Sequence, residues 1–175
     1  IRTRIGMAKS KFSNLATTLT SKKVSYKLKL KILDSNVFLI MKYGAETWPM
    51  TKTFEEKVNA FEMWCYRRIS GTSWKEKKTN IEVCQKIGTT PSLLKKIATA
   101  ALKYYGHIER HHNILKEILD GRIEGRRSRG RQRNMWTDNI KRWANKSKMQ
   151  ECTTAAQDRL VWRNISRQPQ MMGGH

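Results

Sequence analysis

Long apolar runs are missing from this chain of 175 residues. The longest, 37–41, is far shorter than the roughly 20 residues that a membrane-spanning helix needs, so we expect no membrane partner. No apolar signal segment follows Ile1 either. A secreted protein would begin with such a segment, so we expect an intracellular protein, in the nucleus, the cytoplasm or both. A first residue other than Met suggests a fragment of a longer protein.

Cysteine is scarce, and its spacing matches no metal-binding motif. The three cysteines are Cys65, Cys84 and Cys152. An odd number of widely spaced cysteines argues against a disulfide framework and for a reducing compartment. His107, His111 and His112 cluster, but no Cys-x-x-Cys or His-Glu-x-x-His accompanies them. We therefore predict no metal and no cofactor, and interpret Cys65 and Cys84 as small buried hydrophobic residues.

Acidic residues are few and scattered. Nuclease and polymerase active sites need clustered carboxylates to hold divalent metals. Isolated acids in this chain include Asp34, Glu46, Asp120, Asp138 and Asp158, and no two aspartates are adjacent. A phosphate-binding glycine loop ending in Lys-Ser/Thr and a nucleophile–base pair are also missing. We therefore assign no catalytic residue and predict that this chain by itself is not an enzyme.

Positive charge, in contrast, is abundant. Lys and Arg total 36 against 14 Asp and Glu, a net charge of +22. The densest run lies between residues 121 and 133 and contains Arg122, Arg126, Arg127, Arg129, Arg131 and Arg133. Gly125 and Gly130 disfavour helix there, so we interpret the run as a phosphate-binding loop, with Lys141 and Arg142 extending its surface. The alternative is a solvated hinge between two helices.

Aromatic residues lie among the cations. We expect Trp64, Trp136 and Trp162 to be core residues, because they lie on apolar helix faces. Trp74, in a polar loop, stays a candidate for stacking on a nucleobase. Glu46 lies in an apolar setting, where we expect a structural ion pair with an arginine such as Arg67.

Hydrophobic periodicity predicts an all-α fold of seven or eight short amphipathic helices. In the first half of the chain we expect helices over 3–19, from the Ser25 N-cap to about 43, and from a Thr53 capping box to 69. A Thr79 capping box begins a short helix that ends at 88, and Thr90-Pro91 begins a longer one that extends to about 108 with an interruption at Gly106. The last two helices are expected over 136–145 and over about 154–166, the latter with Thr153 or Thr154 as its cap. Residues 114–119 fit either a helix or a hairpin arm.

Composition also suggests a domain organisation. We expect a helical segment over 1–50, a helical middle region over 51–120, a basic loop with C-terminal helices over 121–167, and a disordered tail over 168–175.

Several motifs carry a family resemblance. In chain order they are Arg4-Ile5-Gly6 with Phe12, Tyr43-Gly44-Ala45-Glu46-Thr47-Trp48, the segment 60–69, Trp74 with Thr79-Asn80, the Tyr-Gly-His element at 104–110, the Arg-Gly run ending in Trp-x-Asp-Asn-Ile at 121–140, and Ala156-Gln157-Asp158-Arg159 with Trp162-Arg163. Collinear from about residue 2 to 167, they resemble the endonuclease–reverse transcriptases of non-LTR retrotransposons, in the region that follows the palm. The residues expected to be structural are Tyr43, Gly44, Glu46, Trp48, Trp64, Gly106, His107, Trp136 and Trp162.

The resemblance implies a C-terminal piece, the thumb and the helices beyond it, of an RNA-directed DNA polymerase that uses divalent metal. The endonuclease and the palm aspartates of that family are absent here, so no catalytic residue carries over. The implied partners are RNA and DNA, as template, target or hybrid, and the rest of the parent polymerase. One departure is the apolar segment 97–101, which replaces a more basic stretch of the family.

Two other functions remain open from the residues. Trp143 and Trp162 are nineteen residues apart, a spacing that weakly resembles Myb-like domains. Such a helix-turn-helix module would bind DNA with sequence specificity. The second alternative is a structural thumb whose basic surface faces only its own palm and bound duplex.

Overall fold

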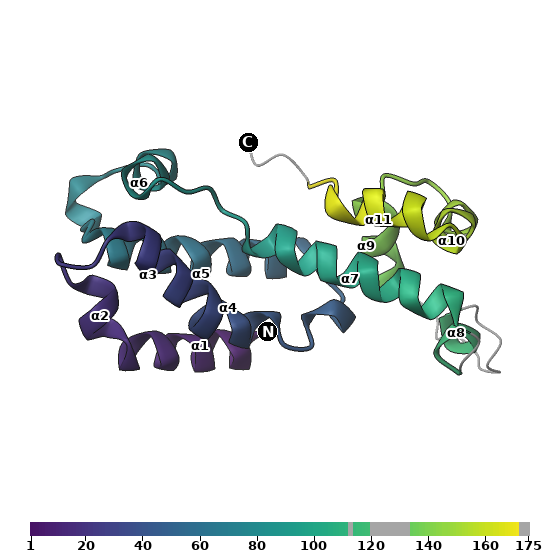
Figure 1. Ribbon diagram of the computed structural model, residues 1–175, viewed down its shortest axis with the longest axis horizontal. Helices are drawn as coiled ribbons and strands as arrows, with labels where there is room; N and C mark the ends of the chain where they lie inside the picture. The colour runs from purple at the N-terminus through teal and green to yellow at the C-terminus, as the bar shows by residue number, and fades with distance from the viewer. Residues whose placement is uncertain (112–113, 120–133, 172–175) are drawn as a thin grey trace. The chain divides into compact units, whose positions relative to one another are not determined.

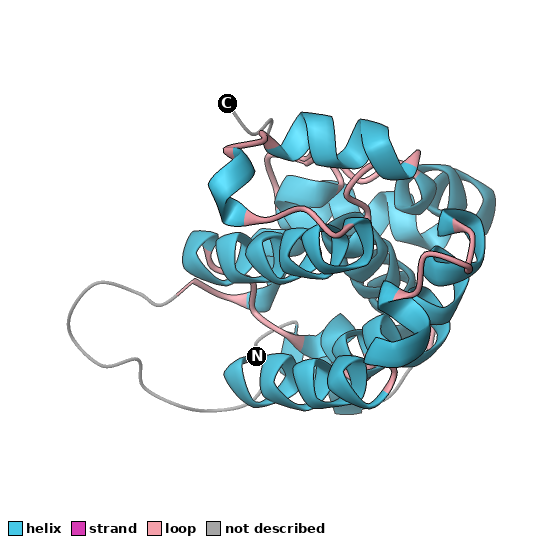
Figure 2. Ribbon diagram, turned by 90° about the vertical axis from the view of Figure 1, so that its left-hand side faces the viewer, coloured by secondary structure: helices cyan, strands magenta, loops and turns pink. Residues whose placement is uncertain are grey.

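The computed structural model describes residues 1–111, 114–119 and 134–171, except for the side chain of Trp74. Within this part of the chain all regular secondary structure is helical and no strand forms (Figure 2). Eight of its α-helices have seven or more residues. The predicted all-α fold is therefore confirmed.

The chain divides into two compact units, and its helices are labelled in Figure 1. Unit 1 comprises 1–43 and 52–94, and unit 2 comprises 44–51 and 95–175, boundaries other than those of the predicted segments. Unit 1 contains α1 (Arg2–Asn14), α2 (Ala16–Thr20), α3 (Tyr26–Ile32), α4 (Phe38–Lys42), α5 (Lys52–Ser70) and α6 (Asn80–Ile87). Helix α7 (Leu93–Arg110) begins in unit 1 and continues in unit 2, which contains α8 (Ile114–Leu119), α9 (Trp136–Trp143), α10 (Met149–Gln157) and α11 (Arg159–Arg167).

Unit 1 has a core of aliphatic and aromatic side chains from α1 to α6. Phe38 of α4 packs edge-on against two rings of α5, with centroid distances of 6.2 Å to Phe61 and 6.3 Å to Tyr66. Ala8, Phe12 and Leu19 are buried, as the predicted apolar face of 3–19 requires. Cys65 and Cys84 are buried thiols, which confirms their interpretation as hydrophobic residues.

A π-helical turn over Leu33–Val37 joins α3 to α4 and changes which residues face the core. Ser25 caps α3 as predicted, since its side chain accepts a hydrogen bond from the Leu28 N–H. A π turn adds one residue to the helical repeat, however, so a 3.6-residue pattern does not continue through it. In α3, which precedes this turn, the apolar Leu28 is 50% exposed, whereas Lys29 is only 3% exposed.

The N-terminus of α7 is capped by a side chain from another helix. Glu62, in the middle of α5, is fully buried. Its carboxylate accepts hydrogen bonds from the backbone N–H groups of Ser92 at 2.8 Å and Leu93 at 3.1 Å, and from the Tyr66 hydroxyl at 2.7 Å. An anion at a helix N-terminus satisfies otherwise unpaired N–H groups and interacts favourably with the helix dipole. Glu62 therefore ties the start of α7 to α5.

Unit 2 is organised around aromatic rings from α7, α9 and α11. The ring of Tyr105 lies 6.1 Å from Trp136 and 5.4 Å from Trp162. The Trp162 indole N–H donates to the Leu102 carbonyl at 2.7 Å. A methyl group on Gly106 would overlap this indole. The predicted interruption at Gly106 is thus wrong: α7 runs through it, and glycine is needed for the close approach of Trp162.

Several helix boundaries agree with the local signals in the sequence. The Thr79–Glu82 capping box forms as predicted, and Gly44, with φ of 69°, follows α4. Residues 114–119, for which a helix and a hairpin arm were both predicted, form a helix. At Thr53 the prediction is wrong, because α5 already begins at Lys52. Helix α7 begins at Leu93, beyond Pro91, where the Glu62 carboxylate lies.

The C-terminal part differs more from the prediction. Instead of one helix over 154–166, two helices form, and Thr153 and Thr154 lie inside the first. The second begins at Arg159, after the N-cap Asp158, whose side chain accepts from the N–H groups of Leu160 and Val161. The predicted disorder is wrong for the first residues of the tail, because Pro169 is buried and the Gln170 N–H donates to the Trp143 carbonyl at 2.9 Å.

Glu62→Gln tests the cap on α7. The amide keeps the size of the side chain but has one acceptor oxygen and no charge. We expect a loss of roughly 1.5–3 kcal/mol in the free energy of unfolding, the range for hydrogen bonds to charged groups. Chemical denaturation measures it. Tyr66→Phe, which removes one bond to the same carboxylate, should cost about 1 kcal/mol. Equal stability of Glu62→Gln and the parent chain would contradict the cap.

Gly106→Ala tests the contact with Trp162. The new methyl group overlaps the indole, so we expect a loss of roughly 1–3 kcal/mol, typical of overpacking. Gly6 in α1 is the matched control, since nothing lies within 4 Å of a methyl group there. Gly6→Ala should be stabilising by about 0.5–1 kcal/mol through helix propensity. Thermal unfolding of both variants separates the two effects, and similar shifts would rule out the steric explanation.

Candidate nucleic-acid interface

The predicted phosphate-binding surface is only partly covered by the structure. Its six arginines, from Arg122 to Arg133, lie outside the described residues. Lys141 and Arg142 are described, on α9, and both are half-buried. Lys141 Nζ lies 3.0 Å from Asp138 Oδ1, and the Arg142 guanidinium lies 5.6 Å from the centre of the Trp143 ring. Both cations therefore already have contacts on their own helix.

Helix α9 is fixed by contacts to the segment 44–51. Asn139 is 2% exposed, and its amide pairs with both main-chain groups of Met50: Oδ1 accepts from the N–H at 2.8 Å and Nδ2 donates to the carbonyl at 2.7 Å. The Trp136 indole N–H donates to the Glu46 carbonyl at 2.7 Å. These bonds place Lys141 and Arg142 on a packed element, next to the end of the arginine run in the sequence.

Asp138 completes the first turn of α9. Its carboxylate accepts from the Met135 N–H at 2.9 Å. This hydrogen bond, together with Lys141, holds the pKa of Asp138 below its usual value. The carboxylate therefore stays charged at neutral pH and neutralises part of the positive charge on this helix.

Glu46 and Arg67, which were expected to form an ion pair, belong to different units, and each has hydrogen bonds within its own unit. Arg67 donates to the Lys78 carbonyl at 2.8 Å and to Asn80 Oδ1 at 3.0 Å, all within unit 1. Glu46 contributes its main-chain carbonyl, as the acceptor for Trp136.

The remaining motif residues lie in different environments. Tyr43 is 70% exposed, and the Arg4 guanidinium lies 4.7 Å from the centre of its ring. Trp48 is half-buried and His107 is exposed, with its ring 4.3 Å from that of His111. Among the residues that the structure describes, no three His, Cys, Asp or Glu side chains are arranged to hold a metal ion.

The three tryptophans predicted as core residues do not share one environment. Trp162 is 2% exposed, as predicted, and Trp136 is half-buried with its N–H bonded. Trp64 is also only half-buried, and two cations lie over its ring: Lys9 Nζ at 5.2 Å and the Arg68 guanidinium at 4.4 Å from the centroid. The core assignment is therefore correct for Trp162, whereas Trp64 and Trp136 are only partly buried. Lys9 comes from another helix, which sequence spacing does not reveal.

A second basic site surrounds the C-terminus of α5. A cavity of about 550 Å³ is lined by Lys22, Lys29 and Lys86 among others. Lys29 Nζ donates to the Ile69 carbonyl at 3.3 Å, and Lys86 Nζ to the Ser70 carbonyl at 2.8 Å. Burial lowers the pKa of Lys29. Two of these lysines thus serve the last carbonyls of a helix, a structural role.

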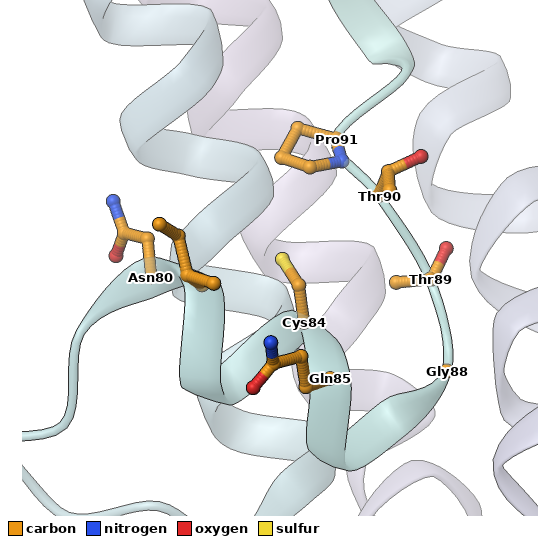
Figure 3. Close-up of a pocket in the computed structure, with 8 residues that line it drawn as sticks. Asn80, Cys84, Gln85, Gly88, Thr89, Thr90 and Pro91 are labelled. Carbon is orange, nitrogen blue, oxygen red and sulfur yellow. The ribbon is translucent and has the colours of Figure 1, made fainter. Parts of the chain in front are cut away.

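A pocket of about 770 Å³ lies between α6 and the segment that follows it (Figure 3). Its lining includes Cys84 and Pro91. Burial raises the pKa of the Cys84 thiol, so the reactive thiolate is disfavoured. Burial likewise raises the pKa of Cys152, to about 11. The lining of this pocket has no acid and no histidine among the described residues, and we assign it no catalytic chemistry.

Comparison with known proteins gives no match. No family model, no curated protein and no solved structure is similar to this chain. In the described part of the chain, none of the helices combines the length and the apolar character needed to cross a bilayer.

Asn139→Ala tests how firmly α9 is held. The change leaves the buried N–H and carbonyl of Met50 without their partner, so we expect a loss of roughly 2–3 kcal/mol in unfolding free energy. Asn164, exposed on α11, is the matched control and should change stability by about 0.5 kcal/mol or less when mutated to Ala. Urea denaturation compares the two. A small effect of Asn139→Ala would show that the segment 44–51 is not anchored through this amide.

Proposed function

We propose that this chain binds nucleic acid through its cationic surface, as the C-terminal region of a non-LTR retrotransposon reverse transcriptase. The observation that carries the proposal is the charge: 36 basic against 14 acidic side chains, with the densest run directly before α9. A surface of this kind attracts a polyanion, and a nucleic-acid backbone is the commonest one in a cell. The contacts are to phosphates, so affinity depends little on base sequence.

The packing of the family-like motifs supports the proposed parent protein. Gly106, in the Tyr-Gly-His element, receives Trp162 of the closing motif. Trp136, in the Trp-x-Asp-Asn-Ile motif, bonds to Glu46 of the Tyr-Gly-Ala-Glu-Thr-Trp motif. Motif residues that are far apart in the sequence thus meet inside unit 2. These contacts explain the motifs as residues that maintain a fold shared with the family. The cations outside the core are then the residues that bind nucleic acid.

Under this proposal the chain binds and orients nucleic acid, while catalysis belongs to the palm of the parent polymerase. The bound species is template RNA, target DNA or their hybrid. No cofactor is proposed for the chain itself, and divalent metal would act in the parent active site.

The helix-turn-helix alternative is less favoured. Helices α10 and α11 are separated by Asp158 alone. A helix-turn-helix motif joins its two helices by a turn of about three or four residues. Strong discrimination between duplex sequences at constant salt would nevertheless favour this alternative over phosphate binding.

Fluorescence anisotropy tests the proposal on single-stranded RNA, duplex DNA and an RNA–DNA hybrid across a salt series. For about six phosphate contacts on duplex DNA, the plot of log affinity against log salt has a slope near −5. Changing Arg126, Arg127, Arg129, Arg131 and Arg133 to Ala should make this slope less negative by several units. Absence of binding to all three nucleic acids would overturn the proposal.

A control variant separates the contribution of the arginine loop to nucleic-acid binding from that of net charge. Changing Lys23, Lys27, Lys31, Lys95 and Lys103 to Ala removes the same number of charges from exposed positions. We expect a smaller change of slope than in the loop variant. If the slope is less negative for the control than for the loop variant, the lysine surface is the phosphate contact and the arginine loop is a hinge.

A further inference from the structure

A cleft in unit 1 combines an accessible aromatic ring with several cations. It has a volume of about 430 Å³ and is lined by Arg2, Ile5, Lys9, Lys57, Ala60, Phe61 and Trp64. Arg2, Ile5 and Lys9 are on one face of α1, and the other four belong to α5. Of the side chains that the structure describes around this cleft, three are cations and none is acidic.

The ring of Trp64 is held in place from behind. Phe12 packs edge-on against it at a centroid distance of 5.0 Å, and Phe61 lies nearly parallel to it at 6.1 Å. Phe12 is 1% and Phe61 3% exposed, so these contacts belong to the core. Trp64 itself is only half-buried. A rigidly supported ring that still reaches the surface is suited to stacking on a flat partner.

The cations over the ring lie at the surface, where a ligand can displace them. Lys9 and Arg68 lie over the Trp64 ring and are both exposed. A cation over an aromatic ring at an exposed site is weakly held. A base covers much more of the ring than a single cation does, and a displaced Lys9 or Arg68 can then bind a phosphate of the same strand.

We propose that this cleft binds one nucleotide of a single-stranded RNA or DNA, with the base stacked on Trp64. The neighbouring phosphates are bound by Arg2, Lys9 and Lys57. A single strand is required because bases inside a duplex are stacked on each other and their faces are not accessible. The volume of the cleft lies in the range of roughly 300–1,000 Å³ that is typical of small-ligand sites.

This inference rests on the proposed function and deepens it. Phosphate binding by the arginine loop needs no base and no aromatic ring. A stacking site in unit 1 adds a preference for unpaired nucleotides, such as a template strand or a nicked end. It also gives the N-terminal basic helix α1 a specific role.

The test is a double-mutant cycle between Trp64 and a base, in the full chain. Anisotropy is measured with a short oligothymidine and with an oligonucleotide of equal length and charge in which abasic sites replace the bases. The parent chain should bind the abasic strand roughly 5- to 100-fold more weakly. Trp64→Leu, which keeps an apolar side chain without an aromatic face, should bind both strands with similar, weak affinity. Trp64→Phe should keep the affinity for oligothymidine within about threefold of the parent.

The cations are tested by their salt dependence. Changing Arg2, Lys9 and Lys57 to Ala together should make the log–log slope on a single strand less negative by about 2, at roughly 0.7 for each phosphate. Thermal unfolding of each variant checks that it is folded. Should Trp64→Leu fail to fold, the variant of Arg2, Lys9 and Lys57 still tests the location, since an unchanged salt slope on oligothymidine would exclude this cleft as the site.

The outcomes separate this inference from the proposed function. If the parent chain binds the abasic strand as tightly as oligothymidine, there is no stacking site, while phosphate binding stands. If Trp64→Leu discriminates the two strands as the parent does, stacking occurs at another ring and the assignment to Trp64 is overturned. If the parent chain binds neither strand at any salt concentration, the inference and phosphate binding of single strands fail together.

Discussion

The excess of positive charge is the constraint on which the arrangement of this chain depends. With 36 basic and 14 acidic side chains, most cations have no carboxylate to pair with. Several of them donate instead to carbonyls at the ends of helices. Lys29 and Lys86 donate to the last carbonyls of α5, and Arg110 donates to the Ala156 carbonyl near the end of α10. Helix C-termini offer unpaired carbonyls and the negative end of the dipole, so they stabilise cations without using the few acids.

The acids that are present have correspondingly specific structural roles. Glu62 caps α7 from within α5, Asp158 caps α11, and Asp138 binds the first turn of α9. Each is at a helix N-terminus, where a carboxylate is stabilised by N–H groups. Among the described residues, these acids and helix-end carbonyls pair with only part of the cations, and others, such as Lys23 and Lys27, are exposed. Under the proposed function, exposed cations of this kind are the ones that bind the nucleic-acid backbone.

Local signals in the sequence predicted local structure well. Ser25 and the Thr79–Glu82 box formed the caps that were expected, since a cap depends only on neighbours a few residues away. Two predictions for α7 failed because of distant groups. Helix α7 begins at the Glu62 carboxylate rather than at Pro91, and it continues through Gly106 because Trp162 occupies the space beside that glycine. Neither partner is near in sequence.

By itself, the sequence determined the helical class and the cationic character, because these follow from composition and short-range periodicity. Only the tertiary structure decided which tryptophan is covered. Trp64 and Trp162 both lie on apolar helix faces, yet Trp162 is enclosed by α7 whereas Trp64 reaches the surface between the cations of α1 and α5. The difference depends on which helix packs against each ring, and packing is a property of residues that are distant in the chain.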